Sequence, residues 1–244
     1  VCSSDLLLKR AGVSNAVLHE AVKRGLFEIY KKEINRFAEL GNVLEEPPTL
    51  SEEQRRAYGE IHQSMRQHAI TLLHGVTSSG KTSVYMHLIA DALQLGKQVL
   101  YLVPEIALTT QLTRRLRRVF GDRLLIYHSK FSDNERVDIW KRLLESNEPC
   151  VVIGVRSSVF LPYSNLGLVI VDEEHDSSYK QQDPAPRYNG RNAALILAQM
   201  HGAKTVLGSA TPAIEVYHLA LEGKYGLVKL LTRYGDIQMP EVKD

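Results

Sequence analysis

Residues 75–82 carry the spacing Gly-x-x-x-x-Gly-Lys-Thr, which is the pattern of a phosphate-binding loop when a strand precedes it and a helix follows. Glycines there allow backbone N–H groups to converge on a phosphate at the start of a helix. Lys81 is expected to reach the β- and γ-phosphates, and the Thr82 hydroxyl to bind Mg²⁺. The predicted nucleotide contacts in this loop are Gly75, Thr77, Ser78, Ser79, Gly80, Lys81 and Thr82. The sequence therefore predicts a site for ATP with Mg²⁺.

A second chemical signal is the apolar run at residues 168–171, which ends abruptly in Asp-Glu-Glu-His. Ligands bind beyond the carboxyl ends of strands in open α/β sheets, so the acids stand where chemistry is expected. Asp172 suits the Mg²⁺ shell, and Glu173 is placed to orient and polarise an attacking water. An exposed acidic turn would explain the tetrapeptide alone. The preceding phosphate loop favours the catalytic interpretation.

These segments need a scaffold, and apolar strands alternate with amphipathic helices through the rest of the chain. Repeated strand–helix alternation predicts an α/β fold with a parallel sheet covered by helices on both faces. The expected strands are residues 70–73, 98–103, 124–127, 150–154, 166–171 and 205–208. The expected helices are residues 81–95, 107–120, 133–145, 191–201 and 213–221.

The first 41 residues have a separate pattern. Helical periodicity at residues 6–8 and 17–22 is broken by Gly12, and residues 26–37 alternate as a strand would. Ser14 is the expected N-cap of the second helix and Gly25 the residue after its end. The order fits a partial winged-helix domain at 1–41, or a small helical extension. Consecutive prolines at 47 and 48 predict an extended linker at 42–48.

Composition sets outer limits on function. The 244 residues are 44% hydrophobic and 24% charged, which is the balance of a globular protein. No apolar run is long enough to cross a bilayer, so no membrane association is expected. Two distant cysteines offer neither a disulfide framework nor a zinc-ligand pair, which favours a cytoplasmic setting. A net charge of +2 does not by itself indicate nucleic acid.

The Asp-Glu-Glu-His run resembles motif II of superfamily 2 helicases, and other segments resemble their remaining motifs in order. Gln54 lies in a segment similar to the one that reads adenine. Residues 103–108, 154–157 and 208–211 resemble motifs Ia, Ib and III. The resemblance implies that Thr211 belongs to the catalytic machinery. It also implies DNA-binding or coupling roles for Pro104, Glu105, Arg156, Ser157, His175 and Ser209. Strand-end loops of this kind can hold DNA phosphates without reading sequence.

Residues 179–192 narrow the resemblance from superfamily 2 helicases in general to one family. The stretches 179–183 (Tyr-Lys-Gln-Gln-Asp) and 186–188 (Pro-Arg-Tyr) resemble the aromatic-rich loop of the bacterial primosomal replication-restart helicases, the PriA family. In that family the loop senses single-stranded DNA and couples it to ATP hydrolysis. Tyr179 and Tyr188 would offer stacking faces, and Lys180, Arg187 and Arg191 would supply positive charge. This chain has Tyr-Asn-Gly-Arg-Asn at 188–192 where many relatives have Tyr-His-Ala-Arg-Asp.

The resemblance implies a RecA-like P-loop lobe at 49–233 and an exit segment at 234–244. It implies 3′-to-5′ unwinding of DNA, restart of stalled forks and loading of the primosome. Implied partners are forked and single-stranded DNA, single-strand-binding protein and primosome components. Zinc belongs to the family's cysteine-rich module, and we expect no zinc site in this chain. The family's second motor lobe, with its arginine finger, is also expected to lie elsewhere, so the fragment should bind ATP but hydrolyse it poorly. Residues 1–6 resemble a translated sequencing adapter, a hypothesis that the nucleotide sequence would test.

Three alternatives remain open at this point. A RecG-like or restriction-type superfamily 2 translocase would share the early motifs but not residues 179–188. A small-molecule kinase would share the phosphate loop but not the ordered motifs Ia, Ib and III. A pure DNA-binding module would keep its DNA affinity when Lys81 and Glu173 are replaced.

Overall fold

The computed structural model describes residues 12–26, 44–128 and 133–233. The chain divides into two compact units, Val1–Glu39 and Leu40–Asp244, which are described separately. In the first unit, helix α2 (Asn15–Lys23) begins after Ser14 and is followed by Gly25 with a positive φ of 71°, as predicted. The expected helix at residues 6–8 and residues 27–37 of the expected strand lie outside the described residues, so the winged helix stays a prediction.

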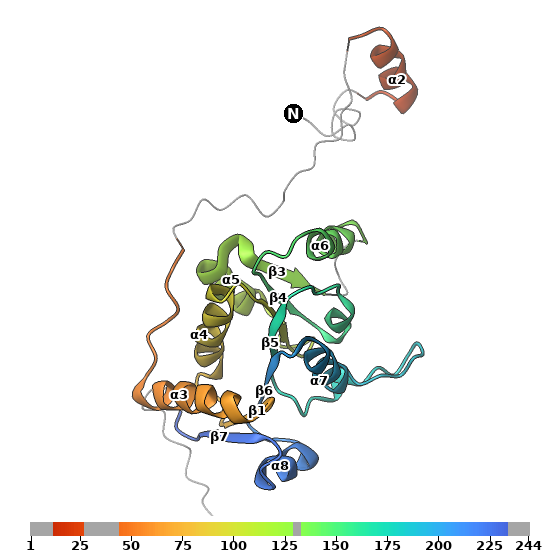
Figure 1. The fold of residues 1–244 in the computed structure, drawn as a ribbon. Helices are drawn as coiled ribbons and strands as arrows, with labels where there is room; N and C mark the ends of the chain where they lie inside the picture. Colours follow the sequence, from red (N-terminus) through yellow and green to blue (C-terminus); the bar gives the residue numbers. More distant parts are fainter. Residues whose placement is uncertain (1–11, 27–43, 129–132, 234–244) are drawn as a thin grey trace, which may run out of the picture. The chain divides into compact units, whose positions relative to one another are not determined.

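The second unit is built on a sheet of seven strands that pair only in parallel (Figure 1). In spatial order they are β3 (Leu124–Tyr127), β4 (Val151–Gly154), β2 (Gln98–Leu102), β5 (Leu166–Val171), β6 (Lys204–Ser209), β1 (Ile70–Gly75) and β7 (Gly226–Leu230). Because the strands are parallel, their carboxyl ends share one edge of the sheet. Most segments of this unit that are predicted to bind nucleotide and DNA follow strand ends, so they gather at that edge, whereas Gln54 lies in a helix before β1.

Helices cover both faces of the sheet (Figure 1). The helices α3 (Glu52–Gln67), α4 (Lys81–Gln94) and α5 (Thr110–Phe120) cover one face, and α6 (Asp133–Glu145), α7 (Gly190–His201) and α8 (Ile214–Leu221) cover the other. Each face of the sheet packs against its helices in an apolar core. Along strand β2, Val99 and Tyr101 pack in the first core, under α3, α4 and α5, while Leu100 and Leu102 pack in the second, under α6, α7 and α8. The predicted α/β fold with a parallel, doubly covered sheet is confirmed.

Some elements differ from those expected. Helix α3 and strand β7 were not predicted. Helix α5 begins at Thr110 rather than at residue 107, because the backbone turns after Pro104, where Ala107 N–H donates to the Pro104 carbonyl. Thr109 then caps α5, with its hydroxyl oxygen accepting from Leu112 N–H at 3.2 Å. Short 3₁₀ turns η1 (Gly121–Arg123), η2 (Arg156–Phe160) and η3 (Ser177–Tyr179) connect the elements.

The segment 44–50, which includes part of the predicted linker, lies along the lobe. Glu45 N–H donates to the Arg118 carbonyl at 3.0 Å, His87 Nε2 contacts the Pro48 carbonyl at 3.0 Å, and Leu50 is buried in the first core. The segment therefore contacts α5 and α4 on its way to the start of α3. Within the described ranges, no helix is both long and apolar enough to cross a membrane.

Candidate active site

The phosphate loop connects β1 to α4 at the carboxyl edge of the sheet. Its backbone takes positive φ angles at Ser78 (62°) and Gly80 (80°), and Gly80 immediately precedes α4. A left-handed conformation costs glycine nothing, so Gly80 suits a loop that turns sharply into a helix. Thr77 and Ser78 are exposed while Ser79 is buried. The loop therefore presents its outer residues to the space that a phosphate would occupy.

Lys81 lies across this loop. Its Nζ donates to the Gly75 carbonyl oxygen at 2.9 Å and lies 3.4 Å from Oε1 of Glu173. The Lys81 side chain is 9% exposed, so its charge is held close to the loop. The structure thus brings together two of the predicted catalytic residues. The lysine is bound by the loop and by the acid that follows β5.

Asp172 follows β5 and is contacted by three tyrosine hydroxyls, two at its carboxylate and one at its backbone carbonyl. Tyr85 donates its hydroxyl to Oδ1 at 3.1 Å, Tyr101 lies 3.4 Å from Oδ2, and Tyr179 donates to the Asp172 carbonyl at 2.6 Å. Burial, followed by repulsion from Glu173, raises the pKa of Asp172 to about 6, although Lys81 acts in the opposite direction. Sequence reasoning did not identify Tyr85 or Tyr101, because a tyrosine in an apolar run reads as core.

The predicted Mg²⁺ ligands lie at one place. The Thr82 side chain neighbours the Tyr101 hydroxyl, which in turn contacts the Asp172 carboxylate. A hydroxyl and a carboxylate supply oxygen ligands of the kind Mg²⁺ prefers. These residues fit a magnesium ion. When bound, the ion would neutralise charge on the nucleotide phosphates.

Glu173 has an unusual backbone. Its φ is 44°, in the left-handed region that a non-glycine residue rarely occupies, and its N–H donates to Asp172 Oδ1 at 3.1 Å. Strain of this kind persists where the surroundings fix it, as at active sites. One carboxylate oxygen faces Lys81 and the other lies 3.8 Å from His175 Nδ1. The turn therefore directs the Glu173 carboxylate toward Lys81, which follows the phosphate loop.

Gln54, predicted to read adenine, uses both ends of its amide inside the protein. Its Nε2 donates to the Ser79 carbonyl at 2.9 Å, and its Oε1 accepts from Ser51 N–H at 3.0 Å. The second contact closes a capping box at the start of α3. Gln54 is therefore beside the phosphate loop, as its motif suggests, but it is buried and already bonded.

His175 connects the acids after β5 to the segment after β6. Its Nδ1 lies 2.7 Å from the Ser209 hydroxyl and its Nε2 lies 3.3 Å from the Thr211 hydroxyl. Ser209 also accepts from Thr211 N–H at 3.0 Å. The three residues predicted from motifs II and III are thus in direct contact, and a change on one strand end can reach the other.

A buried ion pair lies behind the site. Glu174, 1% exposed, accepts from Arg191 NH1 and from Ala213 N–H, each at 2.7 Å. A second Arg191 nitrogen donates to Glu215 at 3.1 Å. The Arg191 guanidinium, predicted to act in DNA binding or coupling, is paired with both acids and is 11% exposed, and its role stays a prediction. Glu174 and Glu215 were missed as partners of Arg191, because no local sequence pattern joins residues so far apart in the chain.

The residues of motifs Ia and Ib take different positions. Pro104 is buried after β2, whereas Glu105 is exposed. Arg156 begins η2 after β4 and donates to the Ser178 carbonyl at 2.9 Å, with Ser157 next to it in the same turn. Gly190 lies against Arg156, because a Cβ at Gly190 would come within 2.8 Å of the arginine Cβ. The Arg156 contacts thus tie η2 to both ends of the aromatic-rich loop.

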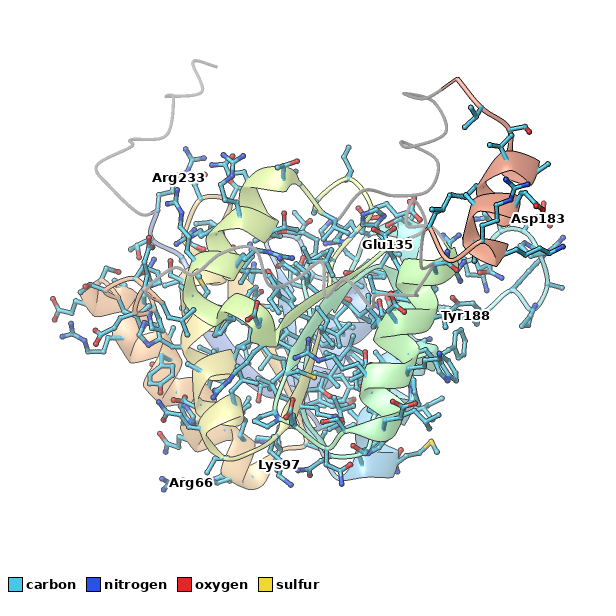
Figure 2. The ribbon with its side chains drawn as sticks, turned by 90° about the horizontal axis from the view of Figure 1, so that it is seen from above. Arg66, Lys97, Glu135, Asp183, Tyr188 and Arg233 are labelled. Carbon is cyan, nitrogen blue, oxygen red and sulfur yellow. The ribbon has the colours of Figure 1, made fainter. Side chains whose placement is uncertain are left out.

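That loop, residues 180–189, extends away from the lobe (Figures 1 and 2). A single antiparallel bridge joins Lys180 to Asn189 at its base, and Lys180 Nζ donates to the Arg187 carbonyl at 2.9 Å. Figure 2 shows Asp183 farther from the sheet than Tyr188. Arg187 lies 3.6 Å from Asp183, and both side chains are exposed. The predicted cations Lys180 and Arg187 therefore remain accessible.

The two tyrosines of this region have different environments. Tyr179, predicted to act in DNA binding or coupling, is 1% exposed and belongs to the second core, so its ring is not accessible here and its role stays a prediction. Tyr188 is partly exposed and meets Phe160 edge-to-face, with ring centroids 4.9 Å apart. Phe160 is 55% exposed, and sequence reasoning missed it. Together Phe160 and Tyr188 form an accessible aromatic pair beside Arg156.

Comparisons with known proteins agree with this geometry. A family model described as DEAD/DEAH box helicase matches residues 51–219. The chain is 39% identical over 240 residues to the replication restart protein PriA of Bacillus subtilis (strain 168), covering 97% of this chain and 30% of that protein. It is 46% identical over 196 residues to the PriA of Rickettsia conorii, covering 80% of this chain and again 30% of the relative. The chain therefore spans just under a third of these relatives.

Among solved structures, RecG bound to a three-way DNA junction matches with a TM-score of 0.54. The sequence identity is 23%, and the match covers 95% of this chain and 27% of RecG. At that identity the likeness concerns the fold alone.

Proposed function

The chain belongs to the DEAD/DEAH box helicase family, and from this premise we propose that it is the ATP-binding motor lobe of a replication-restart DNA helicase. The observation that carries the proposal is the convergence of Lys81, Asp172 and Glu173 at one edge of the sheet. Lys81 would bind the β- and γ-phosphates, Asp172 with Thr82 the magnesium, and Glu173 the attacking water. The lobe would extend over residues 49–233.

In the longer protein, ATP hydrolysis would drive 3′-to-5′ movement on DNA at stalled forks and support loading of the primosome. The identity of 39–46% to PriA proteins supports this function over a RecG-like translocase, to which the likeness is one of fold. Single-strand-binding protein and primosome components would be its partners, and zinc would belong to a region beyond these residues. The contact between His175, Ser209 and Thr211 supports coupling between the nucleotide site and the DNA-binding loops.

This chain by itself would bind MgATP and hydrolyse it slowly. The described part holds one RecA-like sheet, whereas family members close a second lobe over the nucleotide. An arginine finger supplied by such a closure is worth ~10³- to 10⁵-fold in turnover.

The test is MgATP affinity and turnover of the 244-residue chain, with and without single-stranded DNA. Lys81→Ala should abolish detectable MgATP binding. Lys97→Ala should not, because Lys97 bonds to Asn165 just before β2 and β5 begin. This is the edge of the sheet opposite to the one that carries the acids. Equal affinity in wild type and Lys81→Ala would reject the proposed site. A circular dichroism spectrum of each variant establishes that it is folded.

A further inference from the structure

The Asp172 carboxylate is held by hydroxyls from two elements that do not belong to the acidic turn. Tyr85 reaches it from α4 and Tyr101 from β2, at 3.1 and 3.4 Å respectively. Both tyrosine side chains are fully buried. A buried carboxylate needs hydrogen-bond donors, and each tyrosine supplies one donor that can point in only a few directions. The two contacts therefore fix the rotation of the Asp172 carboxylate.

Tyr101 also reaches the other predicted metal ligand. Its hydroxyl contacts Asp172 Oδ2 and is also close enough to the Thr82 side chain for Thr82 to lower the pKa of that hydroxyl, against the larger opposite effect of burial. Tyr101 thus neighbours both side chains that are expected to bind Mg²⁺.

Tyr85 is fixed by the strand beneath it. A Cβ atom at Gly208 would overlap the Tyr85 hydroxyl oxygen and would lie 2.9 Å from the ring carbon that bears it. Only glycine leaves room for the hydroxyl at this point of β6. The Tyr85 and Tyr101 rings also meet edge-to-face, with centroids 5.6 Å apart. Neither ring can turn without displacing its neighbour.

We propose that Tyr85 and Tyr101 are positioning residues for magnesium, whose hydroxyls hold the Asp172 carboxylate in the orientation that the metal requires. The inference rests on the proposed function, since it takes Asp172 and Thr82 as the ligands of a magnesium–nucleotide complex. Groups that orient metal ligands through hydrogen bonds commonly contribute about 10- to 100-fold to metal affinity. Pre-orientation matters for Mg²⁺ in particular, because it demands near-octahedral geometry.

The experiment is a Mg²⁺ titration of the affinity for a fluorescent ATP analogue, using the full 244-residue chain. Tyr85→Phe and Tyr101→Phe keep the rings and remove only the hydroxyls. Each should raise the Mg²⁺ concentration at half-maximal binding by about 10-fold. Affinity for the analogue in EDTA should not change, because phosphate contacts with the loop do not involve these hydroxyls. A general loss of structure would lower both.

Tyr163→Phe is the matched control. Tyr163 is also a buried tyrosine with a bonded hydroxyl, which donates to the Ser158 carbonyl at 3.1 Å, but it makes no contact with Asp172. Its Mg²⁺ requirement should equal that of wild type. Gly208→Ala tests the Tyr85–Asp172 hydrogen bond from β6, because the added Cβ would displace the Tyr85 hydroxyl. Combined with Tyr85→Phe, it should raise the requirement little beyond the larger single effect.

The outcomes separate the two claims. A wild-type chain whose nucleotide binding ignores Mg²⁺ overturns the proposed function and the inference with it. A wild-type chain that depends on Mg²⁺, with folded Tyr85→Phe and Tyr101→Phe variants that depend on it equally, overturns the inference alone.

Discussion

The Nζ atom of Lys81 lies 3.4 Å from Oε1 of Glu173, so the residue expected to bind phosphate is paired with the residue expected to position water. Phosphate and carboxylate therefore compete for one ammonium group. Glu173 also raises the pKa of Asp172 through repulsion, after the larger effect of burial. Both effects would weaken the proposed nucleotide binding.

Glu173→Gln should accordingly bind MgATP more tightly than wild type while losing hydrolysis. Partly exposed ion pairs contribute about 0.2–1 kcal/mol, which corresponds to a gain of about 1.5- to 5-fold in affinity. Isothermal titration with a non-hydrolysable ATP analogue measures it. Glu105→Gln is the control, since Glu105 is exposed in the loop after β2. Weaker binding by Glu173→Gln would show that the carboxylate assists the nucleotide rather than competing with it.

Arg191→Met should destabilise the lobe by about 3–5 kcal/mol, because Glu174 would remain buried without its cation. Glu215→Ala should cost less than about 1 kcal/mol, since the Glu215 side chain is 65% exposed. Urea unfolding followed by circular dichroism measures both. Adding Glu174→Gln to Arg191→Met should recover part of the loss, because an uncharged amide can still accept from Ala213 N–H. Equal costs for Arg191→Met and Glu215→Ala would contradict the buried pair.

Phe160→Ala and Tyr188→Ala should each weaken binding of a labelled oligothymidine. Base stacking on an aromatic side chain is worth about 1–3 kcal/mol, or roughly 5- to 150-fold in affinity. Since the rings are in contact, the double variant should lose less than the sum of the single losses. Fluorescence anisotropy measures these affinities. Trp140→Ala, an exposed aromatic on α6, is the control and should have no effect; an equal loss there would indicate non-specific binding.

Cys150 should resist alkylation while the lobe is folded. Burial is the main reason that the pKa of its thiol rises from 9.0 to about 11, so at pH 8 its thiolate fraction is about a hundredfold below that of the unfolded chain. The neutral thiol is the form the fold favours. Its contribution to stability is complete below pH 9 and is lost as the pH rises toward 11. A Cys2→Ser variant leaves one thiol, and iodoacetamide labelling across a urea series measures its protection. Rapid labelling without urea would mean that the thiol is accessible.

The core strands could be predicted because a buried parallel strand is a continuous apolar run, and β3 and β5 have the predicted bounds. Helix α3 was missed because its surface is largely polar, with only Gln54, Ala57 and Ile61 buried. Its capping residues Ser51 and Gln54 were nevertheless in view. Strand β7 pairs with β1, which is distant in sequence, and no local pattern contains that pairing.

The residues of the candidate site also divide into those that local sequence predicts and those that it does not. Lys81, Thr82 and Asp172 could be predicted because their spacing along the chain places them at strand ends. Tyr179 could not be told from Tyr188, since both are tyrosines in a polar segment and only the three-residue turn η3 directs the first inward. Tyr85 and Glu174 act on residues distant in sequence, and such contacts arise only when the sheet assembles.

Gln54 has a consequence for selectivity among nucleotides. One end of its amide completes the α3 cap and the other holds the Ser79 carbonyl, so a purine that bonds to Gln54 must displace contacts the protein already makes. Base recognition here is an exchange of hydrogen bonds, and its net gain is one bond's difference, about 0.5–1.5 kcal/mol. In a competition between ATP and GTP, the preference for adenine should therefore stay near or below tenfold. A nucleotide site built in this way would discriminate weakly between bases. Most of its affinity would come from contacts with the phosphates.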